Sequence, residues 1–245
     1  MNANQLKLFM MGLMVLDHLA PLLPPQFVVP FNILTRCVGV FFGFMAVEGF
    51  HYTRNRKNYL LRLYSWSFIM FAGNTLLNMT VLKQSIWQLH NNIFLTLAVG
   101  VSLLWAIDFA IRIKEPFFRI SASILAFILL AISITGMVEG GFVIIPFMLI
   151  SYFFRTRSKK RDLGYLIFSV CLLLMVIVGL PDYSLETIKM TLETNPEFLF
   201  ITVIPFIHLY NGQKGSNSPF FKYLFYVFYP AHLWLIALIA TTVHR

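Results

Sequence analysis

Charged residues are scarce in this chain. Asp, Glu, Lys and Arg make up 12% of its 245 residues, hydrophobic residues make up 58%, and the mean hydropathy is +0.75. Soluble domains carry roughly 25% charged residues. Long polar stretches are missing as well, since the longest, from Pro181 to Pro196, has only the length of a loop. The composition therefore argues against a separate soluble domain and predicts one integral membrane domain over residues 1–245.

Cysteine is nearly absent, and several enzyme motifs are missing altogether. Cys37 and Cys171 both fall in apolar stretches, without the spacing of a disulfide framework or a metal site. We expect two buried free thiols and no bound metal. The sequence also lacks a glycine-rich phosphate loop and a serine-centred nucleophile motif, so it gives no support to a nucleotide-driven machine or a serine hydrolase.

The chain does contain a series of long apolar runs. A membrane-spanning helix needs about 20 mostly apolar residues, and nine runs approach that length. They are Leu6–Leu23, Pro30–Phe50, Leu60–Leu82, Asn92–Ile111, Phe118–Thr135, Val138–Phe154, Leu163–Leu180, Glu197–Tyr210 and Phe220–Val243. The first run lacks the basic leader and cleavage site of a signal peptide, so we expect a retained helix. The prediction is an all-α, polytopic membrane helix bundle with about nine transmembrane helices, or eight if the short eighth run does not span.

The basic residues predict an orientation. With the N-terminus cytoplasmic, most of the 19 Lys and Arg residues fall in inner loops, while Lys83, Lys189 and Arg245 fall outside and Arg36 alone lies within a span. This asymmetry follows the positive-inside rule. An odd number of spans then places the C-terminus outside, and we expect a multi-pass protein of a bacterial-type plasma (inner) membrane.

Some ionisable residues interrupt the apolar runs. A charged side chain at the centre of a spanning helix costs roughly 2.5–3.5 kcal/mol, so such residues usually face a cavity or a partner. They are Asp17, His18, Arg36, Glu48, Asp108, Glu139, His208 and His232. We expect Glu48 to pair with His51 or Tyr52, which lie about one helical turn further along the same helix.

Asp17, His18 and Arg36 are expected at a similar depth of the bilayer. Successive residues of a helix point about 100° apart, so Asp17 does not hold the ring of His18. We predict that Asp17 pairs with Arg36 across two helices. His18 is then left to face a cavity, where an imidazole can act as a general base. The alternative is that the three residues form an inert structural network.

The last apolar run carries a second polar group. Tyr226, Tyr229 and His232 recur at a spacing of three residues, which predicts that they share one helix face. Pro230 removes a backbone hydrogen bond and favours a kink. The fourth run is preceded by three further polar residues, His90, Asn91 and Asn92. These residues either cap that helix or line the mouth of the same polar cleft.

Four segments together carry a family resemblance. They are LDH in the first run, TRCVGVFFGFMAVEGFHYTRNRKNYLLRL in the second run and the loop after it, NNIFLTLAVG at the fourth, and FYPAHL in the last. The sequence resembles the TraX family, named for the conjugative-pilus protein that acetylates the N-terminus of pilin. The similarity extends from the first span to the last and is most specific in EGFHYTRNRKNYLLRL.

The resemblance implies a membrane-spanning acyltransferase that takes its acyl group, an acetyl group above all, from acetyl-CoA. The family's polar positions correspond to Asp17, His18, Arg36, Glu48, His51, Thr53, Arg54, Asn91, Asn92, Tyr229 and His232. Members often have glycine before the arginine of the second span and a proline after it, whereas this chain has Thr35 and no proline. A pilin acceptor in particular does not follow.

The leading hypothesis from sequence is acyl transfer from coenzyme A to an amine or hydroxyl of a peptide or lipoprotein N-terminus, a lipid headgroup or an envelope glycan. His18 would take the proton of the acceptor or carry the acyl group, with Asp17, Arg36, His232 and Tyr229 as the other catalytic residues. The sequence leaves open whether His18, His232 or both supply the catalytic imidazole. A cytoplasmic cofactor site would comprise Glu48, His51, Arg54, Arg56, Lys57 and Arg62. His90, Asn91, Asn92 and Tyr226 would contact the substrate or its oxyanion.

Three alternatives remain open at this stage. In the first, the basic residues after the second span do not bind a cofactor and only set the topology and contact anionic lipid. The intramembrane Asp, Arg, Glu and His residues also suit a proton-coupled transporter, although the chain shows no inverted repeat. A non-catalytic assembly factor would leave the histidines without a purpose. No nucleic-acid partner is expected, because the basic residues follow membrane topology.

Overall fold

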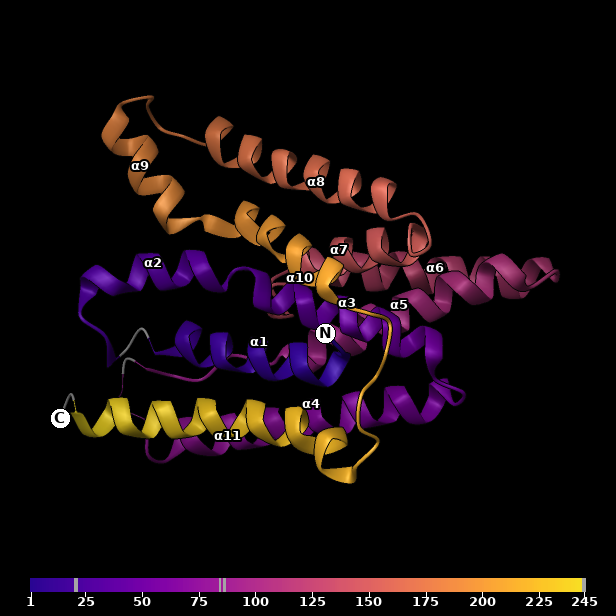
Figure 1. The fold of residues 1–245 in the computed structure, drawn as a ribbon, viewed down its shortest axis with the longest axis horizontal. Helices are drawn as coiled ribbons and strands as arrows, with labels where there is room; N and C mark the ends of the chain where they lie inside the picture. Colours follow the sequence, from indigo (N-terminus) through magenta and orange to yellow (C-terminus); the bar gives the residue numbers. More distant parts are fainter. Residues whose placement is uncertain (20–21, 84, 86, 244–245) are drawn as a thin grey trace. The chain divides into compact units, whose positions relative to one another are not determined.

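The computed structural model describes residues 1–19, 22–83, 85 and 87–243, and within these it contains helices and no strand. Figure 1 shows their order. The elements are α1 (Ala3–His18), α2 (Pro25–Thr35), α3 (Cys37–Tyr52), α4 (Arg56–Met79), α5 (Ile93–Arg112), α6 (Pro116–Ile134), α7 (Gly141–Phe153), α8 (Ser158–Val178), α9 (Leu185–Thr194), the 3-10 helix η2 (Pro196–Val203), α10 (Ile204–Leu209) and α11 (Pro219–Val243). The predicted all-α class is confirmed.

Each of the nine apolar runs contains a helical segment, and residues 20–21 near the end of the first run lie outside the described residues. The second run is divided between α2 and α3 at Arg36, and the eighth is formed by η2 and α10. The stretch from Pro181 to Pro196 was expected to be a loop, and this expectation is wrong, because it contains α9. Ser184 begins that helix by accepting a hydrogen bond from the backbone of Thr187, the usual role of a serine N-cap.

Five helices in the described residues are long and apolar enough to cross a membrane. They are Gln26–Tyr52, Ile93–Arg112, Pro116–Ile134, Ser158–Val178 and Pro219–Val243. Two shorter apolar segments, Gly141–Phe153 and Pro196–Leu209, lie below that length. The chain is therefore a multi-pass membrane protein by helix length and composition, and the number of nine spans remains a prediction.

The chain folds as two compact units. The first unit comprises Met1–Phe41, Leu77–Leu89 and Arg157–Arg245. In it α1 packs against α2 and α11, and α8 packs against η2 (Figure 1). Leu6, Met10 and Met14 recur every four residues along α1 and are fully or almost fully buried. This spacing places one apolar stripe of α1 in the core of the unit.

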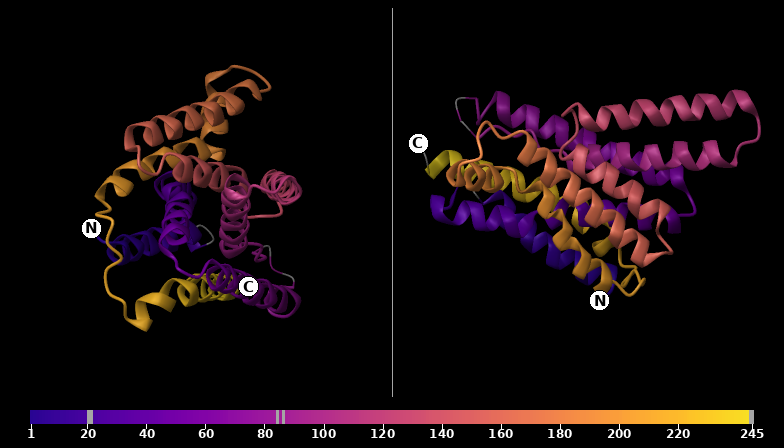
Figure 2. Two further views of the ribbon diagram at one scale, coloured as in Figure 1. Left: turned by 90° about the vertical axis from the view of Figure 1, so that its right-hand side faces the viewer. Right: turned by 90° about the horizontal axis from the view of Figure 1, so that it is seen from above.

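The second unit comprises Phe42–Leu76 and His90–Thr156. Its helices α5 and α6 form an antiparallel hairpin, seen in the right-hand view of Figure 2, and α7 packs against both. Val99, Leu103, Val138 and Ile145 form a buried cluster of this unit. Gly100 allows close packing, since a Cβ there would meet the methionine side chain of α7 at 2.6 Å.

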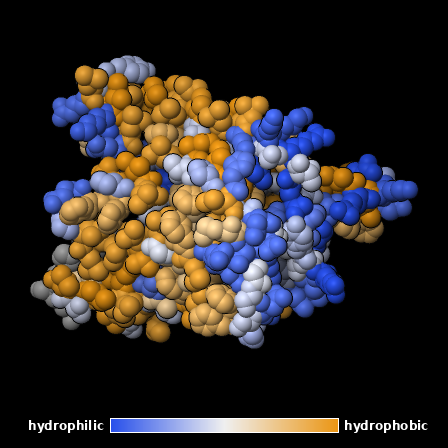
Figure 3. Space-filling view, in the orientation of Figure 1, coloured by the Kyte–Doolittle hydropathy of each residue, from blue (hydrophilic) through white to orange (hydrophobic). Residues whose placement is uncertain are grey.

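Apolar side chains remain exposed on two of the longest helices. Only 11% of the apolar window of α6 is buried, against 67% for α5. Large exposed apolar residues lie along α6 (Phe117, Phe118, Ile120, Ile124, Leu125, Phe127, Ile128, Leu130 and Ile134) and along α8 (Leu163, Leu166, Ile167, Val170, Leu174, Met175 and Val178). Apolar surface also covers much of the face drawn in Figure 3. Rows of exposed apolar side chains along whole helices are unusual on a soluble monomer, so this surface fits contact with lipid.

The two cysteines differ in environment. Cys37 is buried, as expected, whereas Cys171 is exposed. The expectation of two buried thiols is therefore wrong for Cys171. Its position on α8, one of the helices with exposed apolar residues, provides the reason, because an apolar residue of a membrane helix can face lipid instead of a protein core.

The first residue of α7, Gly141, has no room for a side chain. A Cβ there would lie 2.3 Å from a methyl group of Val138 and 2.7 Å from the carbonyl oxygen of Ser133. We expect Gly141→Ala to lower the free energy of unfolding by about 1–3 kcal/mol, the usual effect of overpacking. Gly12→Ala is the matched control, because nothing lies within 4 Å of its Cβ position. Equal melting temperatures of Gly141→Ala and wild type in detergent would contradict this prediction.

Candidate functional site

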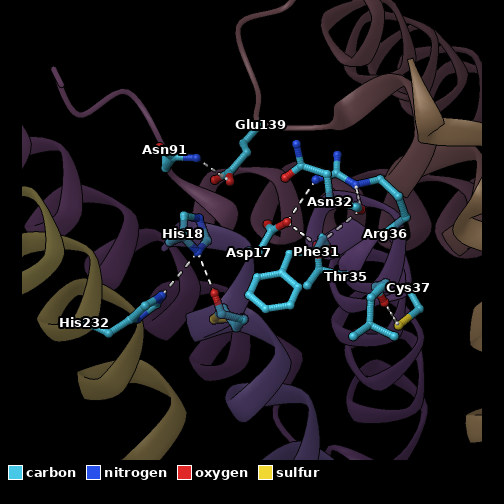
Figure 4. Close-up of polar contacts among 12 residues, drawn as sticks. Asp17, His18, Phe31, Asn32, Thr35, Arg36, Cys37, Asn91, Glu139 and His232 are labelled. Carbon is cyan, nitrogen blue, oxygen red and sulfur yellow. Dashed lines mark hydrogen bonds and ion pairs between the residues drawn. The ribbon is translucent and has the colours of Figure 1, made fainter. Parts of the chain in front are cut away.

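Two histidines from distant parts of the chain meet in the first unit. His18 is the last residue of α1, and His232 lies in the middle of α11. Nε2 of His232 lies 3.4 Å from Nδ1 of His18, and the two ring centroids are 5.2 Å apart in an edge-on arrangement (Figure 4). We call these two residues the histidine pair.

Backbone carbonyls define which ring nitrogens carry the protons. Nδ1 of His18 lies 2.8 Å from the carbonyl oxygen of Met14, and Nδ1 of His232 lies 2.8 Å from that of Phe228. A carbonyl only accepts hydrogen bonds, so each Nδ1 must be a donor. In the neutral rings both lone pairs are then on Nε2. The proton on His18 Nδ1 is donated to the Met14 carbonyl, the lone pair of His232 Nε2 lies 3.4 Å from the same nitrogen as a second, longer contact, and the basic nitrogen of His18 is Nε2.

Aromatic side chains hold the ring of His232. It is buried and stacks on Phe228 with centroids 4.9 Å apart and planes inclined by 17°. The ring of Tyr229, which is also buried, lies edge-on at 5.7 Å. Tyr226 lies one turn earlier on α11, where its ring is 6.0 Å from that of Phe225. The histidine is therefore fixed in orientation by packing as well as by the hydrogen bond of its Nδ1.

Asp17 links the end of α1 to the junction of α2 and α3. Arg36, the residue between those two helices, donates from Nη2 to Oδ1 of Asp17 at 2.9 Å, as predicted. Its Nε donates to the carbonyl oxygen of Asn32 at 2.8 Å. Thr35 also donates to Asp17 (Figure 4). This threonine contact was not predicted, because nothing local shows which acceptor a hydroxyl in an apolar run will meet.

The polar residues before α5 are partly structural. The Asn92 side chain caps α5 by accepting from the backbone N–H of Leu95 at 3.2 Å, and its amide donates to the carbonyl oxygen of Ser67. Asn91 donates to the Glu139 carboxylate at 2.9 Å. Of the two roles considered for this stretch, capping is the one that Asn92 performs. His90 is exposed.

The carboxylate of Glu48 contacts a different partner from the one expected. Its predicted pairing with His51 or Tyr52 is wrong, because Arg155 after α7 donates to it at 2.8 Å and also lies over the Tyr52 ring. Burial opposes the charge of Arg155, yet the hydrogen bond to Glu48 outweighs that effect and raises the pKa of Arg155. Partners this far apart in sequence carry no local pattern.

The basic residues at the start of α4 divide into two groups. Arg56 donates to the buried Asp108 carboxylate at 2.6 Å and lies over the Phe50 ring. Arg112 and Tyr152 complete the partners of Asp108. Arg56 was expected among ligand-binding cations, but this ion pair gives its charge a structural role. The other cations predicted there differ in setting: Arg54 and Lys57 are exposed, and Arg62 lies over the Tyr59 ring.

Two further observations limit the chemistry of the site. Within the described residues, no group of three or more His, Cys, Asp or Glu side chains is arranged to hold a metal ion. His208 lies outside the histidine pair and contacts Asp162 at 2.8 Å, at an exposed position. We therefore take the histidine pair as the candidate functional site.

These features define a helical membrane protein with a histidine pair beside a half-buried ion pair. The chain matches the TraX protein family over residues 2–240, and it belongs to that family. It is 27% identical over 208 residues to the probable fimbrial assembly protein FimC, serogroup H1, of Dichelobacter nodosus. That alignment covers 79% of this chain and 75% of the relative. No solved structure matches.

The Asp17–Arg36 pair should stabilise the first unit. Both side chains are about three-quarters shielded from solvent, so removing one leaves the other without its partner. We expect a double-mutant cycle of Asp17→Ala and Arg36→Ala, followed by thermal unfolding in detergent, to give a coupling free energy of about 1 kcal/mol or more. The exposed Lys189–Glu193 pair is the control and should couple by less than about 0.5 kcal/mol. Additive effects of Asp17→Ala and Arg36→Ala would contradict this assignment.

Arg56 and Lys57 should differ in their effect on stability, although they are neighbours with the same charge. Arg56→Ala removes one cation from buried Asp108, so we expect a loss of about 1–3 kcal/mol in the free energy of unfolding. Lys57→Ala removes an exposed cation and should change it by no more than about 0.5 kcal/mol. Thermal unfolding of both variants in detergent tests this, and similar melting temperatures would count against a structural role for Arg56.

Proposed function

We propose that the protein is a membrane-embedded acyltransferase that moves an acyl group, most simply acetyl, from acetyl-CoA to an amine or hydroxyl. The observation that carries the proposal is the histidine pair, in which the Nδ1 protons of both rings are held by backbone carbonyls and the lone pair of His18 is on Nε2. A neutral imidazole with a defined lone pair is the group that general-base catalysis requires. Membership of the TraX family supports the same reaction class.

In the proposed mechanism, Nε2 of His18 takes the proton of the acceptor as the acceptor attacks the thioester carbonyl. The carbon–sulfur bond breaks, and the departing thiolate of coenzyme A takes the proton back from His18. While His18 is an imidazolium ion, its Nδ1–H donates toward the Met14 carbonyl and the lone pair of His232. This contact stabilises the positive charge that develops in the transition state. The alternative in which His18 briefly carries the acyl group uses the same nitrogen.

Further residues have supporting roles in this proposal. Asp17 and Arg36 position His18 by tying the end of α1 to the adjoining helices. Tyr229, whose ring lies 5.7 Å from that of His232, is the proposed hydroxyl donor to the oxyanion. The exposed cations Arg54 and Lys57, with Arg62, belong to the second unit and are proposed to raise the local concentration of the anionic donor. Nine spans with a cytoplasmic N-terminus would place these cations on the side of the membrane where coenzyme A is found.

The proposed acceptor is a component of the cell envelope. The name of the Dichelobacter nodosus relative describes fimbrial assembly, which favours a protein amine over a lipid headgroup or a glycan. A proton-coupled carrier is the weaker proposal. The carboxylates of Asp17, Glu48 and Asp108 are each paired with an arginine, whereas a proton relay needs carboxylates that gain and lose protons.

The role of His18 is tested by substitution. Release of free thiol from acetyl-CoA is measured with and without an added peptide amine as the acceptor. We expect His18→Ala to lower its rate by at least about 100-fold, because the general base is lost. Its melting temperature should remain near that of the wild type, since the side chain of His18 is only half-buried. His208→Ala is the matched control and should keep full activity. Near-normal turnover by folded His18→Ala would eliminate His18 as the base.

A further inference from the structure

A shallow pocket lies between α1 and α11 near the start of both helices. It is lined by Asn4, Lys7, Leu8, Met11, Phe221 and Phe225, together with Leu224. The lining is mostly apolar and aromatic, and Lys7 is its one charged residue. The proposed mechanism assigns no role to this pocket.

Lys7 has no compensating partner in the part of the chain that the structure describes. No hydrogen bond or ion pair of its ammonium group occurs there, whereas the nearby Lys214 donates to Asn217 at 2.8 Å. An ammonium group has three donors, and a half-buried one among apolar side chains is costly unless an anion or water meets it. The pocket therefore suits a ligand with a negatively charged group, and a phosphate fits the ammonium best.

The pocket and the histidine pair lie on the same two helices in the same register. His18 follows Lys7 by eleven residues, and His232 follows Phe221 by eleven residues. The two helices pack together and run in parallel (Figure 1). Eleven helical residues correspond to about 16 Å along the axis. A ligand that reaches both places must carry its phosphate at roughly this distance from its reacting atom.

Coenzyme A has this geometry. The arm between its pyrophosphate and its sulfur has the chain length of about four extended amino-acid residues, which is roughly 14 Å. The flexible side chain of Lys7 covers the remaining difference. The aromatic rings of Phe221 and Phe225 offer an apolar surface at the phosphate end.

We infer that Lys7 binds a phosphate group of the acyl donor in the α1–α11 pocket, at the distance from His18 that the donor's thioester arm spans. This inference rests on the proposed acyltransferase function. An anionic lipid headgroup carries a phosphate of the same chemistry as the donor's. A lysine near a helix end also readily reaches the membrane surface, where such headgroups lie. The experiment has to separate these two sources.

The test is binding of coenzyme A and of pantetheine, which lacks the phosphates, to the full chain. It is carried out in nanodiscs of phosphatidylcholine alone and in nanodiscs that also contain phosphatidylglycerol. The variants are Lys7→Met, which keeps the aliphatic stem, Lys7→Gln as a second neutral variant and Lys7→Arg, which keeps the charge. Lys222→Met is the matched control, because it removes an exposed lysine from the start of α11 that does not line the pocket.

We expect Lys7→Met and Lys7→Gln to weaken coenzyme A binding about tenfold or more in both lipids and to leave pantetheine binding unchanged. Lys7→Arg should retain most of the affinity, and Lys222→Met all of it. Unchanged coenzyme A affinity in the neutral variants would overturn the inference. If the neutral variants then also lose thermal stabilisation by phosphatidylglycerol, the site belongs to lipid. A wild type that binds no coenzyme A overturns the proposed function together with the inference.

Discussion

A carboxylate placed among apolar helices needs a cationic partner, and this constraint joins helical segments within both units. Asp17 pairs with Arg36, Glu48 with Arg155, and Asp108 with Arg56. Each pair joins residues of different helical segments, so compensation of charge also fixes how those segments lie within their unit. An unpaired carboxylate in lipid would cost several kcal/mol, which gives these contacts more structural importance than ion pairs at a water-exposed surface have.

The histidine pair depends on the same constraint. Asp17 directly precedes His18, so the clamp formed by Arg36 and Thr35 on Asp17 also fixes the end of α1. Capture of both Nδ1 protons by the carbonyls of Met14 and Phe228 then determines the tautomers. The ion pair, the helix end and the imidazole therefore act as one assembly. Substitutions in the Asp17–Arg36 pair should therefore displace His18, although they leave its own side chain unchanged.

Local features of the chain were predictable. The apolar runs coincide with helices because hydrophobicity and helix length are local properties. The Asp17–Arg36 pair was predictable because two opposite charges at one depth in lipid have few other partners. The helix α9 was missed, since its polar sequence resembles that of a loop and its N-cap serine is a weak signal. The exposure of Cys171 was missed because composition does not separate lipid-facing from core-facing apolar residues.

The sequence by itself determined that the chain is all-helical, membrane-embedded and a member of its family, because composition, run length and motif are read residue by residue. Only the tertiary structure decided that His18 meets His232, that Arg56 serves Asp108 and that Glu48 pairs with Arg155. It also brought Lys7 of α1 into one pocket with the phenylalanines of α11. These contacts join residues from far apart in the chain, and their pairing follows from helix packing, which no local pattern encodes.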